Sequence, residues 1–296
     1  MIIRDKPRAW ELAFAMRGSV LPHIALPLLG VVALAAAMVV LDHQFGVLPH
    51  IEGIPFTVFG IALSLFLSFR NNAAYDRWWE ARKLWGGLLA DLRSLARELE
   101  VFAPDQTLRQ RILRQSLAFL HLHRAQLRRL THDAETQARS PELLADPHPP
   151  CSALNLINAD LAAAYANNQI DGFGARTLTA RLGSIALQQA GCERIAGTPL
   201  PFVYSLLIYR TTYLFCLLLP MALIGTSGWL TPLFVGIVAY VFLGLAEVTE
   251  ELSHPFGTTL NALPLDAICR AAEISLAPHL GEPAPKPLQP TDFHLS

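Results

Sequence analysis

The chain has 296 residues, of which 52% are hydrophobic and only 16% are charged, and its 23 basic residues nearly balance its 24 acidic ones. Soluble domains carry about 25% charged residues, so this composition indicates a membrane protein. The balanced charge argues against the strongly basic surface of a nucleic-acid-binding protein, and no nucleic-acid partner is expected.

Three stretches without charged residues mark the expected membrane spans. The first, 18–41, is long enough to cross a hydrocarbon core of about 30 Å at about 1.5 Å per residue. The second, 53–69, is short for a lone span, but its early proline suits a helix start, and the helix is expected to continue past the membrane. The third, 211–246, carries a turn signal at 225–228 and at Pro232, which predicts two short helices. The sequence therefore predicts four transmembrane helices.

Basic residues predict the orientation of these spans. Four of them lie between positions 4 and 17, whereas the 42–52 loop has no lysine or arginine, and arginines resume after Phe69. Because lysine and arginine collect in cytoplasmic loops, the N-terminus is expected inside the cell and the turn near Thr226 outside. We expect a multi-pass protein of the cell's inner membrane with both termini in the cytoplasm.

The rest of the chain predicts an all-α fold with a helical cytoplasmic domain. Leucines at three- and four-residue spacing run from Leu84 to Leu99, and no strand pattern stands out. The stretch 140–150 is expected to be a loop, and the proline-rich tail after Leu280 is expected to be mobile. The expected domains are 1–70, the N-terminal cytoplasmic segment with the first two transmembrane helices; 71–210, the cytoplasmic helical domain; 211–247, transmembrane helices three and four; and 248–296, the cytoplasmic C-terminal segment.

The second predicted transmembrane helix has a polar face. On a helical wheel, the residues that fall within about 120° of one another are Thr57, Ile61, Ser64, Leu65, Ser68, Asn71, Asn72 and Tyr75. Ser64 and Ser68 form a small-residue pair that favours close helix packing, and the alternative interpretation is the lining of a pore.

Ile61, Leu65 and Phe69 recur every four residues on the same helix. If several copies surrounded an axis, these side chains would stack as three apolar rings, a constriction that conducts only when it wets. On periodicity alone, an ordinary core stripe is the favoured interpretation. The block 77–82 with Trp85 is expected at the membrane edge, either as an aromatic belt or as part of a subunit interface.

Candidate metal ligands are few. Glu247, Glu250, Glu251 and His254 include the Glu-x-x-His spacing of di-iron helix bundles, but such sites need a second pair, which the sequence lacks. His121 and His123 diverge on a helix, so no metal site is expected. Without a phosphate-binding loop, a Gly-x-Ser-x-Gly elbow or a His-Glu-x-x-His stretch, we expect no catalytic residue, no cofactor and no enzyme activity.

Three motifs make the chain resemble the bestrophin family, in particular its prokaryotic branch. They are Phe69-Arg70-Asn71-Asn72 leading to Arg77-Trp78-Trp79-Glu80-Ala81-Arg82; Gly191-Cys192-Glu193-Arg194-Ile195 with Thr198-Pro199-Leu200-Pro201-Phe202; and Glu250-Glu251-Leu252 with Pro255-Phe256-Gly257. Their order and spacing extend over nearly the whole chain.

The resemblance implies a homopentamer around one central pore, with monovalent ions and membrane lipid as further partners and any cytoplasmic partner unknown. In the family, three apolar residues on the second membrane helix form a narrow neck, and they fall here on Ile61, Leu65 and Phe69. The polar pore-lining residues then are Thr57, Ser64, Ser68, Asn71 and Asn72. A second, cytoplasmic aperture falls on Phe173, beside Asp171.

The expected function is passive conduction of small monovalent ions. Animal bestrophins conduct chloride and bind calcium through acidic residues after the Pro-Phe-Gly motif; residues 258–262 here have no carboxylate, so calcium gating is not expected. The alternatives are a cation-selective (sodium) channel, as in some prokaryotic members, a metal-binding membrane enzyme that uses Glu247 and its neighbours, and a non-conducting membrane scaffold.

Overall fold

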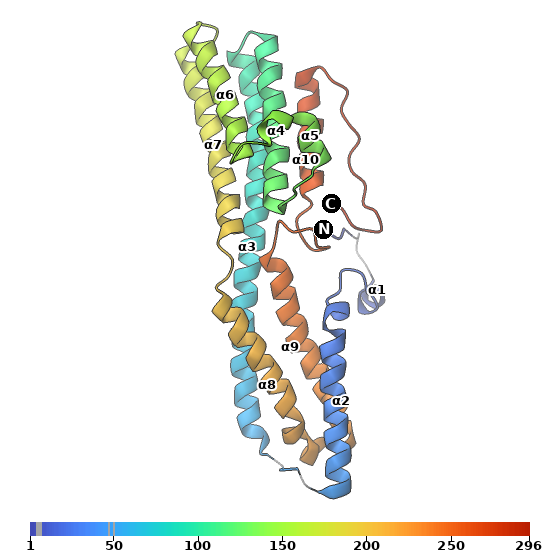
Figure 1. Cartoon of the computed structure of the whole chain (residues 1–296). Coiled ribbons are helices and arrows are strands. Elements are labelled where there is room, and N and C mark those ends of the chain that lie inside the picture. The colour runs from blue at the N-terminus through green and yellow to red at the C-terminus, as the bar shows by residue number, and fades with distance from the viewer. Residues whose placement is uncertain (4–7, 47, 50) are drawn as a thin grey trace. The chain divides into compact units, whose positions relative to one another are not determined.

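Helices make up every named regular element in the computed structural model, which describes residues 1–3, 8–46, 48–49 and 51–296. In chain order (Figure 1) they are α1 (Ala9–Ala13), α2 (Leu21–Phe45), α3 (Gly53–Phe102), α4 (Gln106–Arg128), α5 (Ala134–Arg139), the short 3-10 helix η1 (Pro141–Leu143), α6 (Pro149–Ala166), α7 (Gly172–Gly197), α8 (Phe202–Ser227), the 3-10 helix η2 (Gly228–Leu230), α9 (Thr231–Ser253) and α10 (Leu265–Leu280). The all-α prediction is confirmed for this part of the chain.

The chain folds into two compact units, and helix α3 contributes to both. The apolar unit consists of the described residues of 8–78 together with Pro199–His254. The charged unit consists of residues 1–3, Trp79–Thr198 and Pro255–Ser296, and it holds most of the charged side chains.

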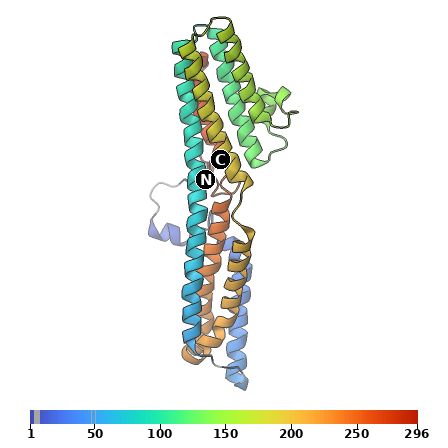
Figure 2. The ribbon, with the colours of Figure 1, turned by 90° about the vertical axis from the view of Figure 1, so that its left-hand side faces the viewer.

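In the apolar unit, α2, α8, α9 and the first half of α3 lie side by side (Figures 1 and 2). Helix α9 packs against both α2 and α8. Ala35 and Ala239 are fully buried in this core, and such small residues let helix backbones approach closely. The helices are apolar around most of their surface, which is typical of membrane segments.

Three helical segments among the described residues are long and apolar enough to cross a membrane: Leu21–Phe45, Gly53–Phe102 and Phe202–Ser253. The last contains α8 and α9 in succession. The predicted domain borders at positions 70, 210 and 247 mark where charged residues begin or end along the sequence, and they remain predictions.

The predicted break in the third apolar stretch is present, but the two helices are not short. Helix α8 has 26 residues and ends at Ser227, directly before Gly228, whose backbone φ of 50° favours glycine. Helix α9 has 23 residues, with a proline in its first turn. Both helices extend beyond the charge-free stretch: α8 begins before the exposed Arg210, and α9 continues past Glu250, which pairs with Arg70.

Helix α3 is 50 residues long, so the prediction that it continues past Phe69 is confirmed. Leu88, Leu92, Leu95 and Leu99 are buried in the charged unit, as their spacing predicts. There α4 packs against α6, α7 and α10.

The end of the proline-rich tail is held by hydrogen bonds, contrary to the expectation that it is mobile. The backbone nitrogen of Ile3 donates to the oxygen of Phe293 at 2.8 Å, and that of Leu295 donates to the oxygen of Met1 at 2.9 Å. Prolines keep this segment out of a helix, and its extended backbone can therefore pair with the N-terminal residues.

Candidate functional site

The first half of α3 has one packed side and one open side. Leu63, Leu67, Arg70 and Ala74 are buried, and their spacing of three and four residues places them on one stripe. On a wheel of about 100° per residue, this stripe lies about 180–240° from Ile61. The core of the apolar unit therefore leaves the other side of α3 uncovered.

The three predicted neck residues lie on this open side. Ile61 is 64% exposed, Leu65 is 52% exposed and Phe69 is 60% exposed. They are thus not part of an ordinary core stripe, which was the favoured interpretation from periodicity alone. Large apolar side chains this exposed on a membrane helix must contact lipid, another subunit or a shared pore.

The predicted polar lining residues divide into two groups. Thr57, Ser64, Ser68 and Asn72 are exposed on the open side, whereas Asn71 is half-buried and its Oδ1 accepts a hydrogen bond from Thr249 Oγ1 of α9 at 3.4 Å. Asn71 therefore packs against α9 in this unit. The exposed polar face of α3 is therefore narrower than the helical wheel predicts, because Asn71 is not part of it.

Two of these hydroxyls are hydrogen-bonded within α3. The Oγ1 of Thr57 donates to the backbone oxygen of Gly53 at 3.1 Å, and the Oγ of Ser64 donates to that of Ile61 at 2.8 Å. A hydroxyl that donates to its own helix keeps acceptor capacity for water. The open side can therefore be apolar at its large residues and hydrated between them.

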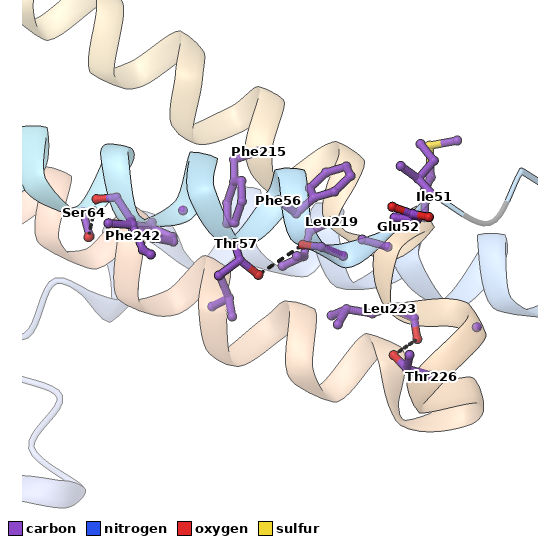
Figure 3. A pocket seen from close by; sticks show the side chains of 17 residues that line it. Ile51, Glu52, Phe56, Thr57, Ser64, Phe215, Leu219, Leu223, Thr226 and Phe242 are labelled. Carbon is purple, nitrogen blue, oxygen red and sulfur yellow. Dashed lines mark hydrogen bonds between the residues drawn. The ribbon is translucent and has the colours of Figure 1, made fainter.

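A cavity of about 760 Å³ borders the part of this face that is nearest the start of α3 (Figure 3). Thr57, Ile61 and Ser64 line it from α3, and Phe215 of α8 and Phe242 of α9 line the other side. The rings of Phe215 and Phe242 meet edge to face at 5.4 Å. Phe59 of α3 also meets the ring of Phe215 edge to face, with 5.5 Å between centroids, so this aromatic cluster holds α3 beside the cavity.

Arg70, the residue after Phe69, anchors α3 to the rest of the apolar unit. Its Nη2 donates to Ser205 Oγ of α8 at 2.9 Å and to Glu250 Oε2 of α9 at 2.8 Å. The arginine side chain is only 7% exposed. A buried cation needs such partners, and it fixes the rotation of α3 about its axis. Sequence reasoning gave no partner for Arg70.

The predicted cytoplasmic aperture residue, Phe173, is 80% exposed in the first turn of α7. Asp171 caps this helix, because its Oδ1 accepts from the backbone nitrogen of Gly174 at 2.6 Å. A side chain added at Gly174 would place its Cβ 2.8 Å from Phe102 Cβ, so glycine allows the start of α7 to approach the end of α3.

Comparison with known proteins identifies the family. Residues 1–278 match the family described as Bacterial/Fungal Bestrophin protein. The chain belongs to the bestrophin family.

Similar proteins are known from several bacteria. A voltage-dependent anion channel-forming protein of Mesorhizobium japonicum is 44% identical over 301 residues, which covers 100% of this chain and 97% of that protein. The voltage-dependent anion channel-forming protein YneE of Escherichia coli is 39% identical over 287 residues and 93% of each chain. The crystal structure of a bacterial bestrophin homologue from Klebsiella pneumoniae superimposes with a TM-score of 0.81 at 35% identity, covering 88% of this chain and 99% of that one.

The candidate metal ligands at the end of α9 take part in other interactions in this bestrophin. Glu250 pairs with Arg70, and the Nδ1 of His254 lies 3.1 Å from the backbone oxygen of Glu250. Glu247 and Glu251 lie 3.8 and 4.0 Å from His23 Nδ1. These contacts join α9 to α2 and α3.

Another group of ligand-type atoms, on His121, Glu135 and Glu273, comes within 4.8 Å in the charged unit. No spacing in the sequence indicates this group, because its members come from three helices. The guanidinium of Arg139 already pairs with both carboxylates. Burial would raise the pKa of Glu273, but the hydrogen bond from His121 and the positive charges of Arg139 and Arg270 outweigh it and hold the pKa below its ordinary value.

Trp85 does not lie in an aromatic belt or on the surface of this chain. It is fully buried in the charged unit, and its ring stacks on His123 with 5.7 Å between centroids and 23° between planes. Phe119 stacks on His123 as well, at 5.8 Å. Trp79 is 46% exposed, and its place at a membrane edge or a subunit interface remains a prediction.

Proposed function

We propose that this bestrophin is an ion channel in which α3 of each subunit lines a shared central pore. The observation that carries the proposal is the exposure of Ile61, Leu65 and Phe69, at every fourth position, on the side of α3 opposite the packed stripe. Around an axis these residues would form the three apolar rings of a neck. Following the family resemblance, the assembly is a homopentamer.

Conduction through this neck is passive. Apolar rings provide no groups to replace the hydration shell of an ion, so they act as a barrier whose height depends on width and wetting. The exposed Thr57, Ser64, Ser68 and Asn72 alternate with these rings and would hold water between them. Phe173, exposed at the start of α7, would form the second aperture.

The permeant species are small monovalent ions, with chloride as the first candidate. Relatives that are 39–44% identical are named as anion channel-forming proteins, which supports anions. The cation alternative is retained because the neck residues carry no charge. No specific observation favours an enzyme or a non-conducting scaffold.

We further propose four spans, formed by α2, the first half of α3, α8 and α9, in the inner membrane with both termini in the cytoplasm. The pairing of Met1 and Ile3 with Leu295 and Phe293 supports a common side for the two termini. Residues 71–201 and 254–296, which lie outside these four spans, would then be cytoplasmic, in agreement with their charge.

Ion flux from liposomes that contain only the purified protein tests this function. Chloride- and sodium-sensitive dyes report which ion moves, and mass photometry of the same sample reports the number of subunits. We expect flux without ATP and a mass of five chains. Vesicles that release neither ion would refute the channel, and a different mass would refute the pentamer alone.

A further inference from the structure

Two carboxylates of the apolar unit, those of Glu52 and Asp76, have no ion-pair or hydrogen-bond partner within the described part of the chain. The unit's other described carboxylates each interact with another group: Glu11 with the backbone of Arg8, Glu247 and Glu251 with His23, Glu250 with Arg70, and Asp42 with a further group. Glu52 and Asp76 are also both exposed. Their charges are therefore available to ions in the surrounding water.

Helix α3 determines the position of both acids, because Asp76 lies on it and Glu52 directly precedes it. On a wheel of about 100° per residue, Asp76 falls between Leu65 and Phe69, the two inner residues of the neck. Glu52 directly precedes α3 and lines the 760 Å³ cavity together with Thr57 and Ile61 (Figure 3). One acid thus lies beyond each end of the proposed neck.

The stretch of α3 between these acids is neutral on its open side. Its one charged residue, Arg70, is buried on the packed side and pairs with Glu250. The exposed Arg210 of this unit lies on α8. In the described part of the unit, the charges nearest the neck along the open side of α3 are therefore both negative.

We propose that Glu52 and Asp76 are selectivity-determining residues, which lower the permeability of anions relative to cations. This inference rests on the proposed function, since rings of charge form only if α3 lines a shared pore. An apolar neck cannot distinguish the sign of an ion, so the nearest charged rings determine it. Walls of low dielectric strengthen the field of such rings at the pore axis.

Reversal potentials in planar bilayers test the proposal under a tenfold gradient of sodium chloride. We expect Glu52→Gln and Asp76→Asn each to raise the chloride-to-sodium permeability ratio about twofold or more, and the double variant to raise it further. The effect should be larger at about 10 mM than at about 1 M salt, because screening shortens the reach of the charges. Glu142→Gln is the matched control, since it removes an exposed acid on η1.

Each result has one interpretation. A conducting wild-type channel whose permeability ratio is unchanged in the double variant would overturn the inference and leave the proposed function intact. A shift of equal size in Glu142→Gln would overturn it too, because the effect would then follow net charge alone. If wild-type protein does not conduct, the proposed function fails, and the inference fails with it. Gel filtration verifies that each variant keeps its assembly.

Discussion

Arg70 Nη2 and Glu250 Oε2 lie 2.8 Å apart, although the two residues are 180 positions apart in the sequence. The pair joins α3 to α9 one residue beyond the proposed neck. Because Phe69 precedes Arg70 in the same helical turn, the arginine also sets the direction in which Phe69 points. The anchor of the helix and the narrowing of the pore are therefore adjacent in the sequence and about 100° apart around the helix.

Arg70→Gln is expected to destabilise the apolar unit. The shorter side chain loses its hydrogen bonds to Ser205 and Glu250, and bonds of charged groups are worth about 1.5–3 kcal/mol each. Because Glu250 is 53% exposed and can turn to water, we expect a net loss of about 1–3 kcal/mol. Thermal unfolding in detergent measures it, with Arg210→Gln, which removes an exposed arginine, as the control. Equal midpoints for the two variants would contradict the anchor.

Two glycines of α7 are expected to respond oppositely to alanine. In Gly174→Ala the new Cβ would lie 2.8 Å from Phe102 Cβ, an atom fixed to its backbone, so we expect a loss of about 1–3 kcal/mol. At Gly183 no atom lies within 4 Å of the added Cβ, and Gly183→Ala should stabilise the helix by about 0.5–1 kcal/mol. Unfolding midpoints that move in opposite directions are the expected result. A neutral Gly174→Ala would mean that α7 and α3 do not approach closely there.

His123 is expected to make folding stability depend on pH. Burial, with a smaller contribution from His148, lowers its pKa from 6.5 to about 3. Below pH 6.5 the unfolded chain therefore binds a proton that the folded chain does not, and stability falls by about 1.4 kcal/mol per pH unit from about pH 6.5 towards pH 3.

His123→Phe should remove this contribution, because a phenyl ring can keep the stacking on Trp85 and Phe119 without taking up a proton. Denaturant unfolding at pH 7 and pH 5 measures the difference between the variant and the wild type. His132→Phe, at an exposed site, should keep the wild-type slope. If both variants keep it, the imidazole of His123 does not have a lowered pKa.

The sequence predicts the helices and the composition of the neck face, because both follow from local periodicity and charge. The length of α3, the buried leucines from Leu88 to Leu99 and the break near Gly228 are examples. Distant contacts leave no such signal. The Arg70–Glu250 pair and the burial of Trp85 depend on helices that come together only in the folded chain.

The direction in which individual side chains point could also not be predicted from the sequence. A wheel of ideal geometry groups Asn71 with Asn72, but Asn71 bonds to Thr249 of α9 and Asn72 is exposed. The wheel gives angles around one helix and contains no information on where neighbouring helices cover it. Which of these side chains are buried is therefore known only from the structure.

Calcium is not expected to change the conductance. The turn after the Pro-Phe-Gly motif closes with a hydrogen bond from the Leu263 nitrogen to the Pro255 oxygen at 2.9 Å, and residues 258–262 have no carboxylate. Calcium needs six to eight oxygen ligands, among which carboxylates usually provide the charge. Bilayer currents with 1 mM EGTA or with about 1 mM calcium should agree, and a current that vanishes in EGTA would show that another part of the chain binds calcium.

Leu65→Ala is expected to raise single-channel conductance. Leu65 is the middle of the three proposed neck residues, and truncation at this position in every subunit would widen the ring and lower the cost of wetting it. We expect an increase of at least about twofold. Leu214→Ala is the matched control, because it shortens a leucine of similar exposure, 50% against 52%, on α8. If both variants conduct like the wild type, Leu65 does not limit the current; if both raise it equally, loss of packing rather than a neck explains the change.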